Sequence, residues 1–326
     1  MRKNVNPEVM FPIFERTGSG PRRFKAGFIN RTGIAVVKSV FDNARPFRCG
    51  LAPVKCGHAW GAVDISGELV IPAIADSPLR IGENGIAYSQ NGKRGIMTRD
   101  GEIVVKPIYR ILAGFEEGAS WMSLGDRYGF VGADGRQIAP PTYEDARSFS
   151  GGLAPVKISG KWGYIDKALE FAVAPRFDFA APFSEGLARV RQDGLWGYVD
   201  RAGEFIIPPR YENARSFRDG LAEVEIANRW GYIDRSGAVI IAPTFRSTSE
   251  FMEGLAAVSP SGDLGKRYGF IDKQGKIAIP VQYELVSDFR YGLCFVTLEK
   301  EVGYIDHNGN LVWRGPYVEA GPVTEL

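Results

Sequence analysis

A motif that returns at almost constant spacing constrains the fold of this chain more than any other feature. With the glycine of Trp162-Gly163-Tyr164-Ile165-Asp166 as anchor, equivalent glycines stand at Gly27, Gly61, Gly95, Gly129, Gly163, Gly197, Gly231, Gly269 and Gly303. Seven of the eight intervals are 34 residues and one is 38, with the four additional residues in the Ser259–Lys266 segment. A fixed period of about 20 to 50 residues is typical of tandem-repeat architectures. The sequence therefore predicts an array of nine units.

Other positions of the unit keep the same register. A glycine follows three residues after the motif's aspartate position in all units but the fifth, which has Leu169. An aromatic residue comes eight residues later, with Ala75 as the exception. A phenylalanine then stands three residues before another glycine, and the segment around Gly82 lacks it. These phenylalanines are Phe47, Phe115, Phe149, Phe183, Phe217, Phe251 and Phe289.

The segments of one unit indicate three antiparallel strands. Gly-Tyr-Ile-Asp, a turn of the form Asp-x-x-Gly and a second apolar segment predict a tight hairpin, and Leu169 in place of the glycine predicts an altered fifth turn. The step Pro209-Arg210-Tyr211 is expected to end the second strand, because proline has no N–H for a sheet ladder. Gly220–Val224 is expected to start a third strand. No segment has a sustained helical period.

A unit of this size buries its apolar faces only against its neighbours, so the units must stack. The predicted fold is an all-β tandem array of nine three-stranded units in an open or nearly closed superhelix. The alternative is a closed ring resembling a β-propeller, which is the poorer match because propellers usually hold four to eight blades of about 40 to 45 residues. The predicted domains are an N-terminal extension (1–23), the repeat array (24–317) and a C-terminal tail (318–326).

The motifs together resemble the bacterial WG-repeat family, also called KWG repeats. Lys161-Trp162-Gly163 matches the longer name, and Trp196-Gly197 and Trp230-Gly231 repeat the pair. The resemblance covers about 24–317 and is strongest in the fifth to ninth units. It implies a bacterial origin, a repeat fold and no assigned enzymatic activity. Some similar proteins look like immunity partners encoded beside secreted antibacterial toxins.

Charge and cysteine content exclude several classes of function. Lys and Arg total 40 against 38 for Asp and Glu, a formal net charge of +2, so no strong field attracts nucleic acid or an anionic membrane. The three cysteines, Cys49, Cys56 and Cys294, lack the spacing of a zinc site or a disulfide framework. No apolar run has the length of a signal peptide or a membrane span. We expect a soluble, cytoplasmic protein, and the oligomeric state stays open.

No catalytic residue, metal site or cofactor site is predicted. The only histidines are His58 and His307. A pair of Cys56 and His58 lacks an orienting group and a recognisable oxyanion donor, and we set it aside. The repeated aspartates allow a calcium-binding interpretation, but a single aspartate per turn is better explained as a turn cap. These aspartates are Asp64, Asp166, Asp200, Asp234, Asp272 and Asp306.

Two kinds of side chain are candidates for binding a partner. An acidic residue stands three before an arginine in Asp42/Arg45, Glu144/Arg147 and Glu212/Arg215. A row of these guanidinium groups suits an acidic protein surface, while the alternative is a local salt bridge in each loop. The tryptophans belong either to the core or to a sugar-stacking ladder.

These features favour a non-enzymatic repeat scaffold that binds another protein. The partner expected from the resemblance is an effector such as a bacterial toxin, so that the chain acts as an immunity or regulatory protein. The alternative function is a carbohydrate-binding module that uses exposed aromatic side chains.

Overall fold

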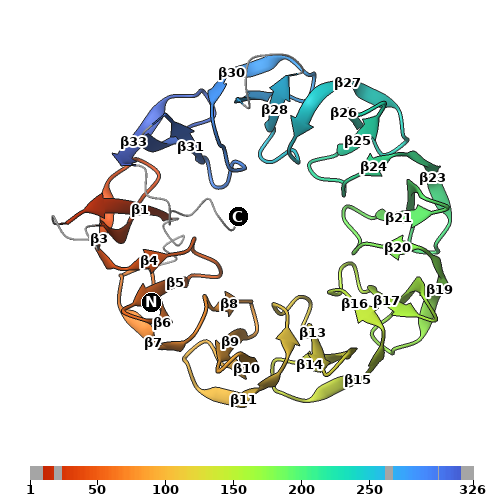
Figure 1. Ribbon diagram of the computed structural model, residues 1–326, viewed down its shortest axis with the longest axis horizontal. Coiled ribbons are helices and arrows are strands. Elements are labelled where there is room, and N and C mark those ends of the chain that lie inside the picture. The colour runs from red at the N-terminus through yellow and green to blue at the C-terminus, as the bar shows by residue number, and fades with distance from the viewer. Residues whose placement is uncertain (1–9, 18–23, 261–266, 300, 317–326) are drawn as a thin grey trace, which may run out of the picture.

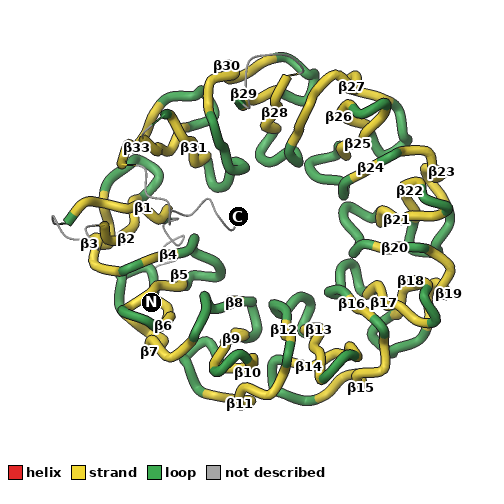
Figure 2. Tube along the Cα trace, viewed as in Figure 1, coloured by secondary structure: helices red, strands yellow, loops and turns green. Residues whose placement is uncertain are grey.

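The chain forms a ring of small antiparallel sheets around a central opening, as the computed structural model shows (Figure 1, Figure 2). The structure describes residues 10–17, 24–260, 267–299 and 301–316. Regular structure in these segments is entirely β. They contain no helix long and apolar enough to cross a membrane. The all-β tandem array predicted from the sequence is confirmed.

Each complete sheet has four strands, which follow one another from the opening to the rim of the ring. The inner strands, two residues each, are β4 (Asn43–Ala44), β8 (Arg80–Ile81), β12 (Ile111–Leu112), β16 (Asp145–Ala146), β20 (Phe179–Ala180) and β24 (Asn213–Ala214). The second strands are β1 (Phe11–Arg16), β5 (Ala52–Cys56), β9 (Ile86–Gln90), β13 (Ala119–Leu124), β17 (Ala154–Ile158), β21 (Ala188–Gln192), β25 (Ala222–Ile226), β28 (Ala256–Pro260) and β31 (Cys294–Leu298).

The third strands carry the motif glycine and the outer strands form the rim. The third strands are β2 (Phe24–Ile29), β6 (Ala59–Val63), β10 (Lys93–Met97), β14 (Arg127–Gly132), β18 (Lys161–Ile165), β22 (Leu195–Val199), β26 (Arg229–Ile233), β29 (Tyr268–Ile271) and β32 (Glu301–Ile305). The outer strands are β3 (Ala35–Phe41), β7 (Leu69–Ala75), β11 (Ile103–Tyr109), β15 (Gln137–Tyr143), β19 (Phe171–Phe177), β23 (Phe205–Tyr211), β27 (Val239–Thr248), β30 (Ile277–Tyr283) and β33 (Leu311–Pro316).

The described strands make nine blades. There are eight sheets, and the seven-stranded one spans two blades because β27 runs from the rim of the seventh blade into the eighth. The sequence motif and the blade are offset by one strand. The strand that begins near Gly220 pairs with the following Trp-Gly strand, so it opens the next sheet instead of completing its own unit.

Two kinds of tight turn join the second, third and outer strands. The Asp-x-x-Gly turn between third and outer strands is capped by its aspartate: Oδ1 of Asp166 accepts hydrogen bonds from the backbone N–H groups of Ala168 and Glu170, at 2.9 and 3.0 Å. Two-residue hairpin turns join second and third strands in the second to seventh blades. In the third, fifth, sixth and seventh blades both turn residues have positive φ, as in Asp193-Gly194 (φ 50° and 83°). Such turns match the twist of the flanking strands, and they were not predicted from the sequence.

The fifth Asp turn differs from the prediction. Leu169 takes the glycine conformation, with φ of 67°, and its N–H donates to the Asp166 carbonyl at 3.0 Å as in the other turns. The expected alteration was therefore wrong. The step Pro209-Arg210-Tyr211 does end its strand, because β23 runs from Phe205 to Tyr211, and the proline lies inside the strand. An outer strand is a sheet edge, where a missing N–H is tolerated.

Neighbouring blades are held together by the tyrosine or phenylalanine of the motif. The Tyr198 ring packs on Phe217 of the next blade with centroids 4.8 Å apart, and its hydroxyl donates to the Arg215 carbonyl at 2.7 Å. Tyr164 and Tyr232 make the same pair of contacts. This explains the repeated phenylalanine, which is a wedge between blades.

The first and ninth blades close the ring with the same chemistry. The Tyr304 hydroxyl donates to the Pro12 carbonyl at 2.9 Å, and the Tyr304 ring lies 5.4 Å from that of Phe11. One buried apolar cluster contains Phe11, Ile13 and Leu293. The nine units therefore form an array whose two ends meet. The sequence favoured an open or nearly closed superhelix, and a closed ring was the alternative.

The structure describes part of the predicted N-terminal extension and none of the predicted C-terminal tail. Part of the N-terminal extension (1–23) forms β1, which pairs with β2 and supplies the second strand of the first blade. The repeat register does not predict β1, because β1 ends at Arg16 and β2 begins at Phe24, a wider separation than between the second and third strands of the other early blades. The predicted C-terminal tail (318–326) and most of the enlarged Ser259–Lys266 loop lie outside the described residues.

Candidate functional site

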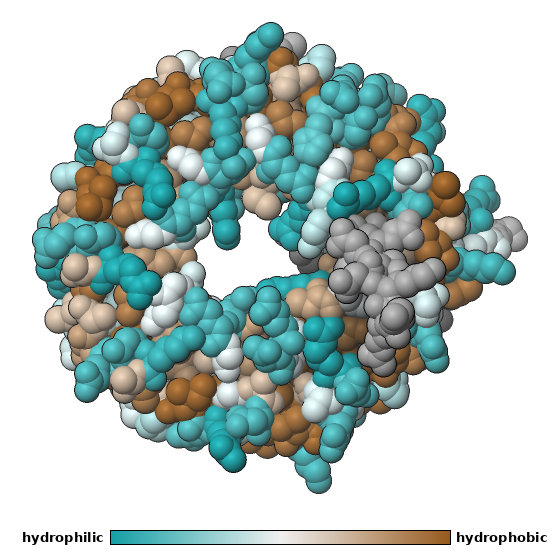
Figure 3. Space-filling view, turned by 180° about the vertical axis from the view of Figure 1, so that it is seen from behind, coloured by the Kyte–Doolittle hydropathy of each residue, from teal (hydrophilic) through white to brown (hydrophobic). Residues whose placement is uncertain are grey.

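The turns that surround the central opening connect inner and second strands, and we call them the inner turns (Figure 2). In the second blade the N–H of Arg48 donates to the Leu51 carbonyl at 2.8 Å, and the reverse bond is 3.1 Å. Cys49 and Gly50 between them have φ of 52° and 78°. A tight turn thus follows the phenylalanine wedge at the opening, which residues of hydrophilic or intermediate hydropathy largely surround (Figure 3).

In the fourth, sixth, seventh and eighth blades, an acidic side chain of the inner turn binds the backbone of the next inner turn and so latches the two together. The Glu117 carboxylate accepts hydrogen bonds from the backbone N–H groups of Gly151 and Gly152, at 2.7 and 3.0 Å. Lys167 of the same neighbouring blade lies 3.5 Å from this carboxylate. The ion pair of Lys273 with Asp219, at 2.7 Å, repeats the arrangement. These contacts were not predicted from the sequence, where their signal is an acidic residue immediately before the glycine of the inner turn.

The first position of the inner turn takes five residue types in eight blades, unlike the packing positions. Here the chain has arginines, an acidic residue, serines, a methionine and a glycine. From the second blade to the ninth they are Arg48, Gly82, Glu116, Ser150, Ser184, Arg218, Met252 and Arg290.

The inner turns form a wall around the central opening, and at the third blade this wall has a hollow. Gly82 has no side chain at the varying position, and Arg48 of the second blade reaches across to Glu116 of the fourth, with Nη2 and Oε1 2.7 Å apart. The hollow has a volume of about 370 Å³, and Arg48, Arg80 and Glu116 are among the residues that line it. Within the described part of the chain, the Arg80 guanidinium forms no hydrogen bond or ion pair.

The three arginines predicted to bind a partner lie over tryptophan rings. Arg45 lies 5.7 Å from the Trp60 centroid, and Arg215 lies 5.5 Å from that of Trp230. Arg147 lies between blades, 5.2 Å from Trp162. The arginines come from the second, fifth and seventh blades, so the ring does not bring them together.

The acidic residues three positions earlier do not form the expected local pairs with these arginines. Glu144 accepts from the N–H of Gly160 at 3.0 Å and so caps a hairpin turn. Asp42 accepts in the same way from Gly57, at 2.6 Å. Arg147 instead pairs with Asp145.

The tryptophans are mainly packing residues. Trp162 is 3% exposed and Trp60 is 5% exposed, whereas Trp196 and Trp230 are half-buried. The Phe179 ring lies 5.4 Å from both Trp162 and Trp196. A continuous ladder of open aromatic faces for sugar stacking is therefore not formed.

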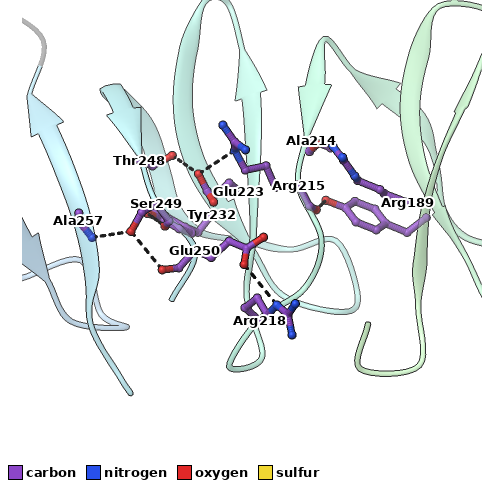
Figure 4. Close-up of polar contacts among 11 residues, drawn as sticks. Arg189, Ala214, Arg215, Arg218, Glu223, Tyr232, Thr248, Ser249, Glu250 and Ala257 are labelled. Carbon is purple, nitrogen blue, oxygen red and sulfur yellow. Dashed lines mark hydrogen bonds and ion pairs between the residues drawn. The ribbon is translucent and has the colours of Figure 1, made fainter. Parts of the chain in front are cut away.

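A buried carboxylate lies between the seventh and eighth blades (Figure 4). Glu223 is 1% exposed, and its Oε2 accepts a hydrogen bond from the Thr248 hydroxyl at 2.6 Å, while Nε of Arg215 lies 3.5 Å away. Oε1 has no hydrogen-bond partner among the described residues. Burial raises the pKa of Glu223 to about 7, although Thr248 and Arg215 act in the opposite direction.

The residues considered for chemistry are not assembled into a site. Burial raises the pKa of the Cys56 thiol, which disfavours the nucleophilic thiolate. His307 stacks on Phe289 at 4.6 Å, and its Nε2 lies 3.1 Å from the Glu253 carboxylate without hydrogen-bond alignment. No group of three or more potential metal ligands occurs among the described residues.

Comparisons with known proteins agree with the repeat and the ring. The family model described as WG containing repeat matches residues 27–57, 95–128, 128–162, 162–196, 196–230, 230–259 and 268–300. No curated protein matches the sequence.

Two solved structures have a similar fold. A crystal structure of the eukaryotic initiation factor aligns with a TM-score of 0.66 at 10% identity, covering 95% of this chain and 96% of that one. Dihydro-heme d1 dehydrogenase NirN in complex with DHE aligns with a TM-score of 0.52 at 12% identity, covering 97% and 74%. At such identities the likeness concerns the fold alone.

Proposed function

The chain belongs to the WG-repeat family, and on that premise we propose that it is a non-enzymatic scaffold that binds another protein at the inner turns of its ring. The observation that supports this proposal is that some positions of the repeat pack the blades together and keep their residue type, while another position at the opening varies. The tyrosine, phenylalanine and glycine positions repeat and hold the blades together. The first position of the inner turn instead takes five residue types in eight blades, and its three arginines are exposed.

This variation favours a protein as the ligand. A repetitive ligand such as a glycan chain is best matched by identical contacts in successive units, whereas a protein surface offers different chemistry at each point of a ring. Arg48, Arg218 and Arg290 stand at three of the variable positions, and arginine is enriched at protein interfaces. Repeat arrays commonly bind partners across such extended surfaces.

The three arginines over tryptophan rings are further candidate contacts, at separate places on the ring. Stacking on an aromatic ring orients a guanidinium, so Arg45, Arg147 and Arg215 would each present a positive charge to an acidic partner in a defined orientation. Arg147 also pairs with Asp145, and Arg215 with Glu223.

Affinity capture tests the proposal. The tagged full chain is used to recover its partner from the source cells, and the pair is then purified and titrated by calorimetry. Replacing Arg48, Arg218 and Arg290 by alanine is expected to weaken binding at least tenfold, or about 1.4 kcal/mol. The ion pairs that are lost, Arg48–Glu116 and Arg218–Glu250, are solvent-exposed, so folding is expected to survive.

The matched control removes the same charge elsewhere. Lys38, Lys106 and Lys276 are exposed on or beside outer strands, and their triple alanine variant is expected to bind normally. Equal binding by both triple variants contradicts the proposed surface, and the absence of a stable complex contradicts the scaffold function.

A toxin is the partner class that the resemblance favours. If the captured partner is a growth inhibitor, co-expression of this chain is expected to restore growth, and the inner-turn variant is expected to restore it less well. A partner without toxicity leaves a regulatory scaffold and removes the immunity role.

A further inference from the structure

The third-blade hollow differs from the rest of the wall by chemistry as well as by shape. Neighbouring blades place Arg48 and Glu116 where this blade has Gly82. Gly82 itself is closely packed, because an added Cβ meets the Phe115 carbonyl oxygen at 3.0 Å. The hollow is lined by residues of the adjoining strands and turns, with Arg48, Arg80 and Glu116 among them.

Positive charge around the hollow is only partly balanced. Arg48 shares Glu116, while the Arg80 guanidinium has no described partner. Arg94, which replaces the motif tryptophan, donates to the Leu112 carbonyl at 2.8 Å. Burial lowers the pKa of Arg94, and the positive charge of Arg80 lowers it further. An anion beside Arg80 relieves this repulsion.

The walls suit a carboxylate attached to a short apolar stem. Pro46, Pro53, Leu79 and Ile81 line the hollow together with the charged groups. Its volume of about 370 Å³ lies near the lower end of the roughly 300 to 1,000 Å³ of ligand pockets. The Glu116 carboxylate in the same wall disfavours a dianion such as phosphate more strongly than a single carboxylate.

We propose that this hollow is the subsite that receives an aspartate or glutamate side chain of the protein partner. The inference rests on the proposed function and specifies the chemistry that the partner presents. Arg80 provides the free guanidinium donors and Arg48 the second positive charge. The proline and leucine side chains cover the methylene groups of the incoming residue.

A short capped polyglutamate peptide with a fluorescent label tests the subsite without the natural partner. Binding to the full chain is followed by fluorescence anisotropy at low ionic strength, because salt screens exposed charges. Arg80→Gln is expected to weaken binding about tenfold, or about 1.4 kcal/mol. Glu116→Gln is expected to tighten binding, because it frees Arg48 and removes a repelling charge.

Arg127→Gln is the matched control. Arg127 is exposed in the fourth blade, at the hairpin turn between β13 and β14, and its loss is expected to leave peptide binding unchanged. If Arg80→Gln and Arg127→Gln weaken binding equally, or if Glu116→Gln weakens it, the subsite is wrong.

Two further measurements distinguish a small-acid ligand from a protein side chain, and failure of the subsite from failure of the scaffold function. Free glutarate is tested as a competitor of the labelled peptide. If its affinity per carboxylate equals that of the peptide, the hollow is a site for small acids and the inference is overturned. A natural partner that binds the Arg80→Gln variant with unchanged affinity also overturns it, while the scaffold function stands. Failure to capture any partner counts against the scaffold, and the peptide titration still decides the subsite.

Discussion

Leu169 in the fifth blade packs against the buried cluster that contains Ala139 of the fourth blade, so an unusual turn residue is matched by an unusually small neighbour. In other blades a glycine turn faces a valine or isoleucine. A Cβ added at Gly135 lies 2.5 Å from Cγ2 of Val105, and one added at Gly203 lies 2.6 Å from Cγ1 of Val173. Ala139 lacks those methyl groups and leaves room for the leucine side chain.

This relationship predicts strong coupling between the two positions. Ala139→Val is expected to destabilise the protein by about 1 to 3 kcal/mol through overpacking against Leu169. The double variant Ala139→Val/Leu169→Gly restores the usual pair and is expected to recover most of that loss, since it also relieves the positive φ of a leucine. Chemical denaturation of the four chains of this double-mutant cycle provides the measurement.

Effects of the two substitutions that add within about 0.5 kcal/mol would falsify the coupling. Because a repeat array can unfold in parts, the fifth-blade transition is followed by hydrogen exchange as well.

The same pair shows which parts of the fold follow from the sequence. The repeat register predicts strands and turns because it depends on local chemistry, as in the capping of its turn by Asp166. The rescue of Leu169 by Ala139 depends on contact between blades, which a single unit does not reveal. Ring closure through Tyr304 and Pro12 is likewise set by the small rotation between blades, accumulated over the whole array.

In the candidate site, too, local features follow from the sequence and contacts between blades do not. Gly82 is recognisable in the sequence as a departure from the repeat, but the hollow beside it needs Arg48 and Glu116, 68 residues apart in sequence, to meet. The arginine series was found by its spacing, and stacking on tryptophan was not anticipated. Whether Arg45, Arg147 and Arg215 bind a partner stays a prediction.

Glu223 predicts a pH-dependent stability. Burial raises its folded pKa from an ordinary value of 4.5 to about 7, so the folded protein holds this proton more tightly than the unfolded chain does. The stabilising contribution is complete below about pH 4.5 and is lost as pH rises through about 7. Relative to Glu223→Gln, the wild type is expected to lose up to roughly 3 kcal/mol over this range.

Denaturation midpoints between about pH 4.5 and 8 test this effect. Glu250→Gln is the control, because Glu250 lies nearby and is partly exposed in its ion pair with Arg218. Parallel pH profiles for the wild type and Glu223→Gln would show that Glu223 is not protonated in the folded state.

Ring closure predicts a local effect of Tyr304→Phe. The variant keeps the ring contact with Phe11 but leaves the Pro12 carbonyl without its hydrogen bond, which is expected to cost about 1 to 3 kcal/mol. Hydrogen exchange should accelerate in β1 and β33 and remain slow in the fifth and sixth blades. Tyr164→Phe, the same change within the ring, should instead accelerate exchange beside Ala181. Uniform acceleration in both variants contradicts closure at this junction.

The glycine that anchors the repeat predicts a steric requirement. The outer strand passes so close to the third strand that a Cβ at Gly163 lies 2.5 Å from the Val173 carbonyl oxygen and 2.7 Å from the Pro175 nitrogen. The pairing shifts register at this point, between Trp162 and Tyr164, so the backbone has no space for a side chain. Gly163→Ala is therefore expected to destabilise the protein by about 1 to 3 kcal/mol or more. Gly114→Ala, where an added Cβ meets nothing within 4 Å, should change the denaturation midpoint little. Equal shifts for the two alanine variants would mean that close approach of the strands is not the reason for the motif glycine.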